Sequence, residues 1–218
     1  MDLMRETPDN HWDLAIVDPP YGIGADTQKE SFSKSKNGWR HRKEWKADWD
    51  KAPPPPEYFE ELRRVSTNQI VWGGNYFDLP PSRCWLMWDK VQEFSGSDFE
   101  LAWSSMDSAS KAFRMARVEA YKGAKIHPTQ KPTRLYKWIL SKYAEPGQHI
   151  LDTHMGSGSI AIACHYFGAY LTACEIDEDY FKAACKRIER ETRQMDLFQE
   201  NTQTHKHTNT QTHKHTNT

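Results

Sequence analysis

The chain has 218 residues, which suffices for one ordinary domain and is short for two. A formal net charge of −1 excludes binding to nucleic acid through overall charge, so any such surface must come from local clusters of Lys and Arg. The four cysteines form no C-x-x-C pair, which indicates reduced thiols. The first residues form no apolar signal segment, and no apolar run approaches the length of a membrane span. We therefore expect a cytoplasmic protein that does not contact the membrane.

Short apolar runs alternate with helical patterns along most of the chain. The expected strands are residues 14–17, 69–72, 84–88, 99–103, 149–152 and 170–176. The expected helices are residues 57–65, 133–143, 159–167 and 177–193. This alternation predicts an α/β fold with a mostly parallel sheet and helices on both faces. Sheets of this kind bind ligands at the carboxyl ends of their strands.

Residues 1–200 are expected to form a single domain, and residues 201–218 a disordered tail. In the tail an octad, Asn-Thr-Gln-Thr-His-Lys-His-Thr, occurs twice and contains no apolar residue. Such a segment cannot offset the entropy cost of its own ordering. Its histidines leave a weak metal-binding tract as the alternative, but the pattern implies no fixed ligand geometry, and we predict no metal site.

A strand, a turn with two glycines and a helix follow one another between residues 149 and 167. Gly156 and Gly158 would let the backbone approach a ligand closely, and the helix start favours an anionic group. Glu175 ends the next strand about 20 residues after Asp152, where an acid can accept hydrogen bonds from a ribose diol. The order of these features predicts nucleoside binding, with NAD and S-adenosylmethionine both open. An ordinary strand–helix connection is the plain alternative.

The tetrapeptide Asp18-Pro19-Pro20-Tyr21 directly follows the first expected strand. The prolines fix their backbone angles, and the Asp18 carboxylate and the Pro19 carbonyl can each accept a hydrogen bond. Tyr21 offers a face for stacking. Together these groups suit a planar exocyclic amine presented edge-on, whereas a proline-rich turn capped by Asp is the structural alternative.

Several segments, taken in order, resemble the motifs of the amino-group DNA methyltransferases. They are residues 18–22, 71–77, 99–103, 127–132 and 152–159. The catalytic tetrapeptide precedes the cofactor motif, which is the circularly permuted order of the β class. The resemblance covers about residues 12 to 190 and implies a Rossmann-like, S-adenosylmethionine-dependent methyltransferase fold.

The resemblance also implies roles for individual residues. Asp18, Pro19, Pro20 and Tyr21 would be catalytic. The cofactor would be bound by Lys131, Asp152, His154, Met155, Gly156, Ser157, Gly158, Ser159, Glu175 and Ile176. Glu175 would hold the ribose, and Lys131 is our candidate for the methionine carboxylate. One departure is that Thr153-His154 stands where the family usually has Pro-Phe, which bears on cofactor affinity rather than on cofactor identity.

The implied activity is methylation of N6 of adenine in DNA after base flipping. Asp before Pro-Pro-Tyr favours adenine, but N4 of cytosine and an RNA base remain alternatives. An alternative of another class is a catalytically silent DNA-binding or clamp-associated module, against which the intact motifs argue. The family also implies a bacterial or phage protein of restriction-modification type. The sequence leaves monomer and homodimer open.

Three further segments concern partners. Residues 22–56 mix basic and aromatic side chains and are predicted to be a DNA-facing loop, with a solvated loop as the alternative. Only residues 104–126 are available for a target-recognition region, which predicts a short form of the family. Gln194-Met195-Asp196-Leu197-Phe198 resembles the peptides that bind the bacterial sliding clamp, with Gln194 fixing register and Leu197 and Phe198 filling a pocket. Folding back on the domain is the alternative.

Overall fold

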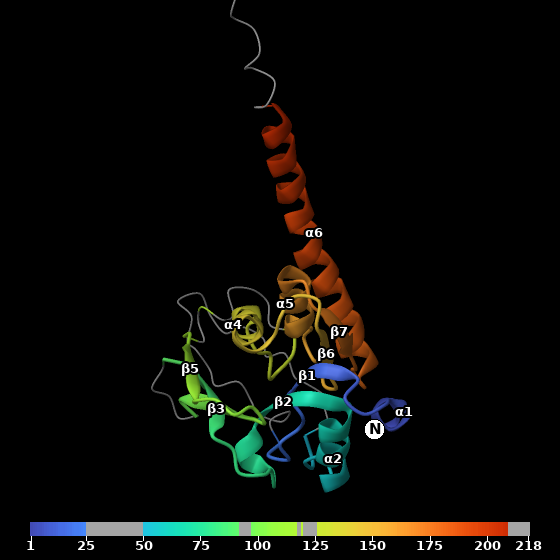
Figure 1. Cartoon of the computed structure of the whole chain (residues 1–218), viewed down its shortest axis with the longest axis vertical. Helices are drawn as coiled ribbons and strands as arrows, with labels where there is room; N and C mark the ends of the chain where they lie inside the picture. The colour runs from blue at the N-terminus through green and yellow to red at the C-terminus, as the bar shows by residue number, and fades with distance from the viewer. Residues whose placement is uncertain (25–49, 92–96, 117–118, 120–125, 209–218) are drawn as a thin grey trace, which may run out of the picture.

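The computed structural model describes residues 1–24, 50–91, 97–116, 119 and 126–208, with side chains as far as residue 193. The strands are β1 Trp12–Val17, β2 Ser66–Trp72, β3 Cys84–Asp89, β4 Phe99–Ser104, β5 Lys111–Arg114, β6 His149–Asp152 and β7 Tyr170–Ala173. The helices are α1 Asp2–Glu6, α2 Pro56–Val65, α4 Thr133–Tyr143, α5 Ser159–Phe167 and α6 Glu178–Thr208, with a 3-10 turn, η2, at Gly74–Tyr76 (Figure 1).

The seven strands of the described residues form one sheet in the order β5-β3-β4-β2-β1-β6-β7. Both pairings of β4 are antiparallel and every other pairing is parallel, so β4 alone runs against the remaining strands. The predicted mostly parallel α/β sheet is therefore confirmed. Because β4 is reversed, its first residues lie beside the last residues of β3, where Phe99 pairs with Asp89. The start of β4 thus reaches the edge at which the other strands end.

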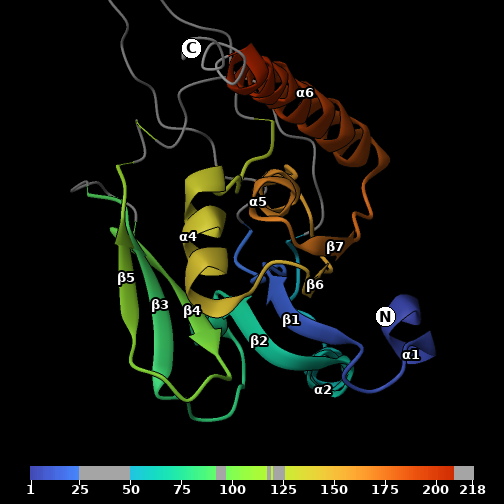
Figure 2. The ribbon, with the colours of Figure 1, turned by 45° about the horizontal axis from the view of Figure 1, so that its top comes forward.

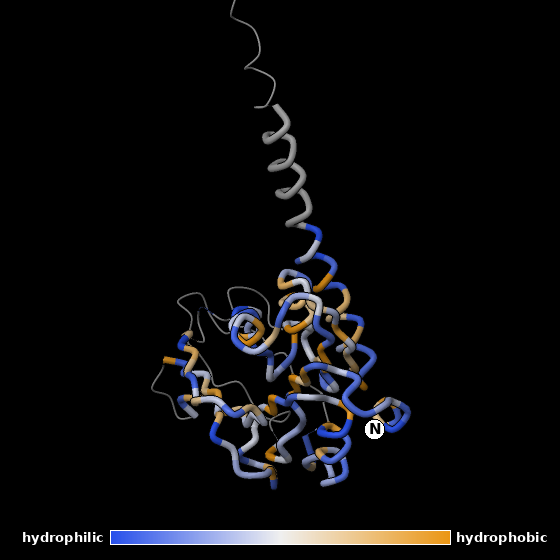
Figure 3. Tube along the Cα trace, in the orientation of Figure 1, coloured by the Kyte–Doolittle hydropathy of each residue, from blue (hydrophilic) through white to orange (hydrophobic). Residues whose placement is uncertain are grey.

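Helices cover both faces of the sheet, as predicted (Figure 2). Successive side chains of a strand point to opposite faces. In β1, Leu14 and Ile16 join the core beneath α4 and α5, whereas Ala15 and Val17 join the core beneath α2. Burial on both faces explains why β1 is a continuous apolar run. Figure 3 accordingly places hydrophobic stretches along the strands and in the helices that face them.

Several elements differ from the sequence-based expectation. The edge strand β5 was not expected, because Lys-Ala-Phe-Arg carries no apolar run and is defined by its pairing with β3. The final helix, α6, continues to Thr208, so residues 201–208 are helical where a disordered tail was expected. Extending an existing helix adds one hydrogen bond per residue without a new nucleation cost. Residues 209–218 lie outside the described part of the chain.

Within the described residues, no helix combines the length and apolar character that crossing a membrane would require.

Candidate active site

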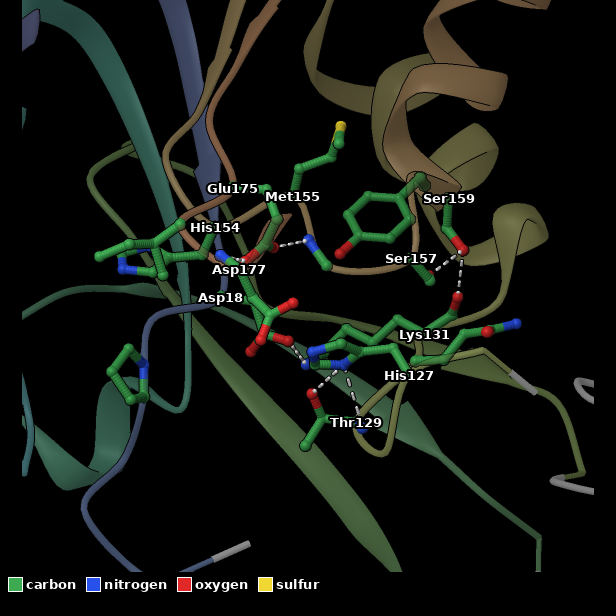
Figure 4. Close-up of a pocket in the computed structure, with 15 residues that line it drawn as sticks. Asp18, His127, Thr129, Lys131, His154, Met155, Ser157, Ser159, Glu175 and Asp177 are labelled. Atoms are coloured by element: carbon green, nitrogen blue, oxygen red, sulfur yellow. Dashed lines mark hydrogen bonds and ion pairs between the residues drawn. The ribbon is translucent and has the colours of Figure 1, made fainter. Parts of the chain in front are cut away.

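A cavity of about 660 Å³ lies at the carboxyl edge of the sheet, a size typical of ligand pockets. It is lined by Asp18, Pro20, His127, Thr129, Gln130, Lys131, Tyr136, His154, Met155, Gly156, Ser157, Ser159, Glu175, Ile176 and Asp177. The structure therefore brings the tetrapeptide, the 127–132 segment and the two-glycine turn together around one space, although they lie far apart in the chain (Figure 4).

Asp18 directly follows β1, and both of its carboxylate oxygens have partners. Oδ1 accepts a hydrogen bond of 2.7 Å from the Tyr21 hydroxyl, and Oδ2 lies 2.5 Å from Lys131 Nζ. Burial raises the pKa of Asp18 above its usual value, and the attraction of Lys131 opposes this rise. An amine that binds Asp18 must therefore use a remaining lone pair of this carboxylate or replace one of these two partners.

The Tyr21 ring packs between segments of the chain. It stacks on Tyr76, with ring centroids 5.0 Å apart and planes 15° apart, and a Cβ at Gly73 would overlap it. Tyr76 itself is about half exposed, with 48% of its surface accessible. Sequence reasoning identified Tyr21 as the stacking residue but did not identify Tyr76 as its neighbour.

Lys131 is deeply buried, with only 2% of its side chain exposed. Its ammonium lies between Asp18 and Glu100, whose Oε2 is 3.3 Å away. The Lys131 carbonyl accepts a hydrogen bond of 2.7 Å from Ser159 Oγ, so its backbone contacts the cofactor motif. The ammonium thus contacts Asp18 of the predicted catalytic tetrapeptide, whereas the sequence suggested Lys131 as a ligand for the cofactor carboxylate. Glu100 was not predicted, and its only sequence signal was membership of the 99–103 segment.

The two-glycine turn is tied to the end of β7 through Glu175. Glu175 Oε2 accepts a hydrogen bond of 2.8 Å from the Gly156 amide, and Oε1 accepts one of 3.0 Å from the Asp177 amide. Gly158 has a φ of 72°, and a Cβ there would lie 2.9 Å from Ile188 of α6. The turn therefore requires glycine for its backbone conformation as well as for space.

The start of α5 carries hydroxyl groups and a buried guanidinium. Ser157 Oγ and Ser159 Oγ lie 3.1 Å apart. Arg187 of α6 donates to the Ser157 carbonyl and to Ser159 Oγ, both at 2.9 Å. Arg187 was not predicted to be near the site, because a Lys- and Arg-rich helix normally faces solvent.

Comparison with known proteins decides the family. Residues 41–186 match the family model described as DNA methylase. The chain belongs to this family, whose methyl donor is S-adenosylmethionine. The matched range does not include residues 18–21, but the cavity joins Asp18 and Pro20 to it.

Two Type II methyltransferases resemble the chain over most of its length. The Type II methyltransferase M2.DpnII of Streptococcus pneumoniae is 27% identical over 172 residues, covering 78% of this chain and 57% of that protein. The Type II methyltransferase M2.LlaDCHI of Lactococcus lactis subsp. cremoris is 25% identical over 171 residues, covering 78% and 56%. The chain thus spans little more than half the length of these two relatives.

Among solved structures, the PvuII DNA methyltransferase (cytosine-N4-specific) is similar with a TM-score of 0.55. The two chains are 14% identical, and the similarity covers 87% of this chain and 86% of that one. This similarity confirms the methyltransferase fold that the motifs predicted.

In this DNA methylase, Thr153 and His154 form a polar chain where the family usually has Pro-Phe. His154 Nδ1 lies 2.9 Å from Thr153 Oγ1, which in turn lies 2.6 Å from the Tyr58 hydroxyl. Burial lowers the pKa of His154 to about 4, so its ring is neutral at pH 7. A neutral planar ring therefore replaces the apolar Phe at the cavity wall.

The other predicted cofactor residues also lie at or beside this wall. Asp152 is buried at the end of β6, and its Oδ1 accepts a hydrogen bond of 2.9 Å from the His154 amide. Burial raises the pKa of Asp152 to about 7. Met155 lines the cavity, and Ile176 lies at its mouth with 94% of its surface exposed.

Two predicted partner segments fall largely outside the described residues. Residues 25–49 of the predicted DNA-facing loop are among them, as are the side chains of Gln194, Leu197 and Phe198. The described ends of the loop are joined, because the Gly22 amide donates to Asp50 Oδ1 at 2.8 Å. In the part of the chain that the structure describes, no group of three or more His, Cys, Asp or Glu could hold a metal ion.

Proposed function

We propose that this DNA methylase transfers the methyl group of S-adenosylmethionine to N6 of adenine in DNA. The observation that supports this proposal most directly is the shared cavity, in which Asp18 faces the two-glycine turn and Glu175. An acceptor for an exocyclic amine and an acceptor for a ribose diol thus line the same space. We further propose a β-class enzyme of short form, acting in the bacterial cytoplasm as the modification component of a restriction-modification pair.

The cavity fits the proposed cofactor. The Glu175 oxygens keep lone pairs for a ribose diol beyond the two amides that they already accept. The start of α5 presents backbone amides, with the Ser157 hydroxyl nearby, to an anionic group such as a carboxylate. The neutral His154 ring adds no charge that would repel a sulfonium. When bound, the cofactor would supply an electrophilic methyl group.

The target amine would be oriented by Asp18 and the Pro19 carbonyl. A base within a duplex is out of reach of this cavity, so we infer that it is flipped, which costs a few kcal/mol. Stacking on Tyr21 would return about 1–3 kcal/mol of this. Positioning the amine against the methyl group is the main source of rate enhancement in this scheme.

A second candidate is N4 of cytosine, because the solved structure that supports the fold is a cytosine-N4-specific enzyme. Labelled methyl transfer to DNA and to RNA, followed by nucleoside analysis, tests both. We expect N6-methyladenine from DNA. Recovery of N4-methylcytosine would replace the adenine assignment, labelled RNA would replace the DNA assignment, and no transfer to either would overturn the proposed activity.

Glu175→Ala is expected to weaken S-adenosylmethionine binding by about 10- to 100-fold, the equivalent of about 1.5–3 kcal/mol for hydrogen bonds to a charged group. The variant removes the proposed ribose acceptor and the group that joins Gly156 to Asp177. Isothermal titration calorimetry measures this change. Glu178→Ala is the matched control, since Glu178 is exposed and forms an ion pair with Lys182 on α6. Equal affinity in Glu175→Ala and wild type would contradict the ribose assignment.

We also propose that residues 22–56 face DNA and that Gln194, Leu197 and Phe198 contact a sliding clamp. The double variant Leu197→Ala, Phe198→Ala is expected to lose clamp recovery in a pull-down, because it removes the two apolar side chains that would fill a pocket on the clamp. Methyl transfer to free DNA should be unchanged. Equal recovery of the variant and the wild-type protein would end the clamp proposal.

A further inference from the structure

Four charged side chains, of which Lys131 is buried and the other three are partly buried, form a row that begins at Asp18. Lys131 Nζ lies 2.5 Å from Asp18 Oδ2 and 3.3 Å from Glu100 Oε2, and Lys90 Nζ lies 2.9 Å from Glu100 Oε1. The charges alternate in sign and sum to zero. Lys131 has 2% of its side chain exposed and Lys90 has 12%, so water screens neither ammonium strongly.

We propose that Lys131 and Glu100 are positioning residues for Asp18. Lys131 keeps the carboxylate ionised and fixes its orientation, and Glu100 balances the charge of Lys131 so that Asp18 still attracts the cation that forms on the target amine. This inference rests on the proposed methyl transfer and adds two residues to its machinery.

The placement of Lys131 favours this role over a purely structural one. An unpaired buried ammonium is costly, and only two carboxylates, Asp18 and Glu100, lie within ion-pair distance of this one in the described structure. Its third nearby oxygen is the Tyr21 hydroxyl at 3.5 Å. Among the described residues, the hydrogen-bond and ion-pair partners of Lys131 Nζ are therefore Asp18, the Tyr21 hydroxyl that donates to Asp18, and Glu100.

Lys131 opposes the effect of burial on Asp18. Burial raises the pKa of Asp18, and Lys131 is the strongest influence that lowers it, while Glu100 raises it. Tyr21, Tyr58, Tyr136 and Asp152 also interact electrostatically with Asp18, and the Tyr21 hydroxyl donates a hydrogen bond to it. Without Lys131, the buried carboxyl would hold its proton to higher pH. A protonated Asp18 cannot attract the positive charge of the reacting amine.

The proposed reaction places a positive charge on the target amine, next to Asp18. In the proposed transfer, the exocyclic nitrogen would supply the electron pair of the new N–C bond. The pair of the broken C–S bond would stay with the departing cofactor, and the positive charge would pass to the nitrogen. The nitrogen then releases one proton, for which Asp18 Oδ1 is the acceptor. The amine takes Oδ1 by replacing the Tyr21 hydroxyl, because the charge-assisted bond of Lys131 to Oδ2 is the stronger one.

Without Glu100, the positive charge of Lys131 would partly cancel the negative charge of Asp18 and so weaken the attraction between Asp18 and the positively charged amine. Burial would raise the pKa of Glu100, but Lys131 and Lys90 outweigh burial and lower it to about 2, so Glu100 is ionised at pH 7. Its charge offsets that of Lys131. The antiparallel direction of β4 places Glu100 at this edge of the sheet, beside Trp88 of β3.

The test compares the pH dependence of kcat in Lys131→Met and Glu100→Gln. Lys131→Met is expected to lose about 100-fold in kcat at neutral pH. The acid limb of its kcat–pH profile, where activity falls as Asp18 takes up a proton, should move to higher pH by at least about one pH unit. Activity should therefore recover as pH rises. Glu100→Gln removes a charge that raises the pKa of Asp18. Its acid limb should therefore move to lower pH, with a plateau about 10-fold lower. A merely structural role would not move the two limbs in opposite directions.

Lys182→Met and Glu178→Gln are the matched controls, because these residues form an exposed Lys–Glu pair on α6, 2.6 Å apart. Both should keep the wild-type profile. Lys131→Arg retains the positive charge, so the acid limb of its kcat–pH profile should match that of the wild-type protein. If Lys131→Met fails to fold, Lys131→Gln replaces it as the uncharged variant and is compared with Lys131→Arg. Cofactor affinity, measured by calorimetry, should stay within about twofold of wild type in every variant.

An unmoved acid limb in Lys131→Met or Lys131→Gln would overturn the inference. Loss of cofactor binding in these variants would also overturn it and would assign Lys131 to the cofactor carboxylate. These outcomes differ from failure of the proposed function, in which the wild-type protein transfers no methyl group to DNA. In that case carboxyl-carbon NMR of Asp18 in the same variants still tests the link to Lys131, and an unchanged Asp18 titration would overturn it.

Discussion

Asp18→Ala is expected to abolish methyl transfer to DNA, with a loss of at least about 1,000-fold in kcat, while affinity for S-adenosylmethionine is retained. The substitution removes the carboxylate that would accept the amine hydrogen and attract the developing positive charge. It also leaves Glu100 as the carboxylate paired with Lys131 among the residues that the structure describes. Single-turnover transfer of labelled methyl groups measures the chemical step, and calorimetry measures cofactor binding.

Two further substitutions make this result interpretable. Asp18→Asn keeps an oxygen acceptor but loses the charge, so its rate should fall between those of Asp18→Ala and wild type. Asp78→Ala, at an exposed aspartate in the β2–β3 connection, should have no effect. If Asp18→Ala methylated DNA at the wild-type rate, Asp18 would not be the amine acceptor and the tetrapeptide would be only a turn.

The parts of the fold that follow from local pattern were predictable from the sequence. The run Leu14–Val17 is apolar at every position because β1 is buried on both faces. The segment Thr133–Tyr143 has one apolar side because α4 is buried along one side of the helix. The meeting of Asp18 with Glu175 was also predictable in outline. Strands in a parallel sheet end at one edge, so residues that follow different strands gather there.

The partners of Lys131 were not predictable, because they depend on strand order and direction. Glu100 reaches the site only since β4 lies between β2 and β3 and runs against both. No local pattern in Phe99–Ser104 encodes that reversal. Sequence reasoning therefore assigned Lys131 to the cofactor from its motif, whereas the structure pairs its ammonium with Asp18. The pairing of β5 with β3 is another long-range contact of this kind.

Gly73→Ala is expected to reduce methyl transfer by about 100-fold without weakening cofactor binding. Gly73 has a φ of 68°, which L residues rarely adopt, and a Cβ there would lie 2.2 Å from Cε1 of Tyr21. The Tyr21 ring must move, which disturbs its stacking on Tyr76 and its hydrogen bond to Asp18. Gly73 does not line the cavity, so S-adenosylmethionine should bind as in wild type.

Gly147→Ala separates displacement of Tyr21 from backbone strain. Gly147 has a φ of 87°, but a Cβ there would meet no atom within 4 Å. Both variants should lose about 1 kcal/mol of folding stability from the left-handed backbone, with a further loss in Gly73→Ala from the overlap. Only Gly73→Ala should lose methyl transfer when both are assayed below their melting temperatures. Equal activity in the two variants would mean that the position of the Tyr21 ring does not govern the reaction, and the base would then have to stack elsewhere.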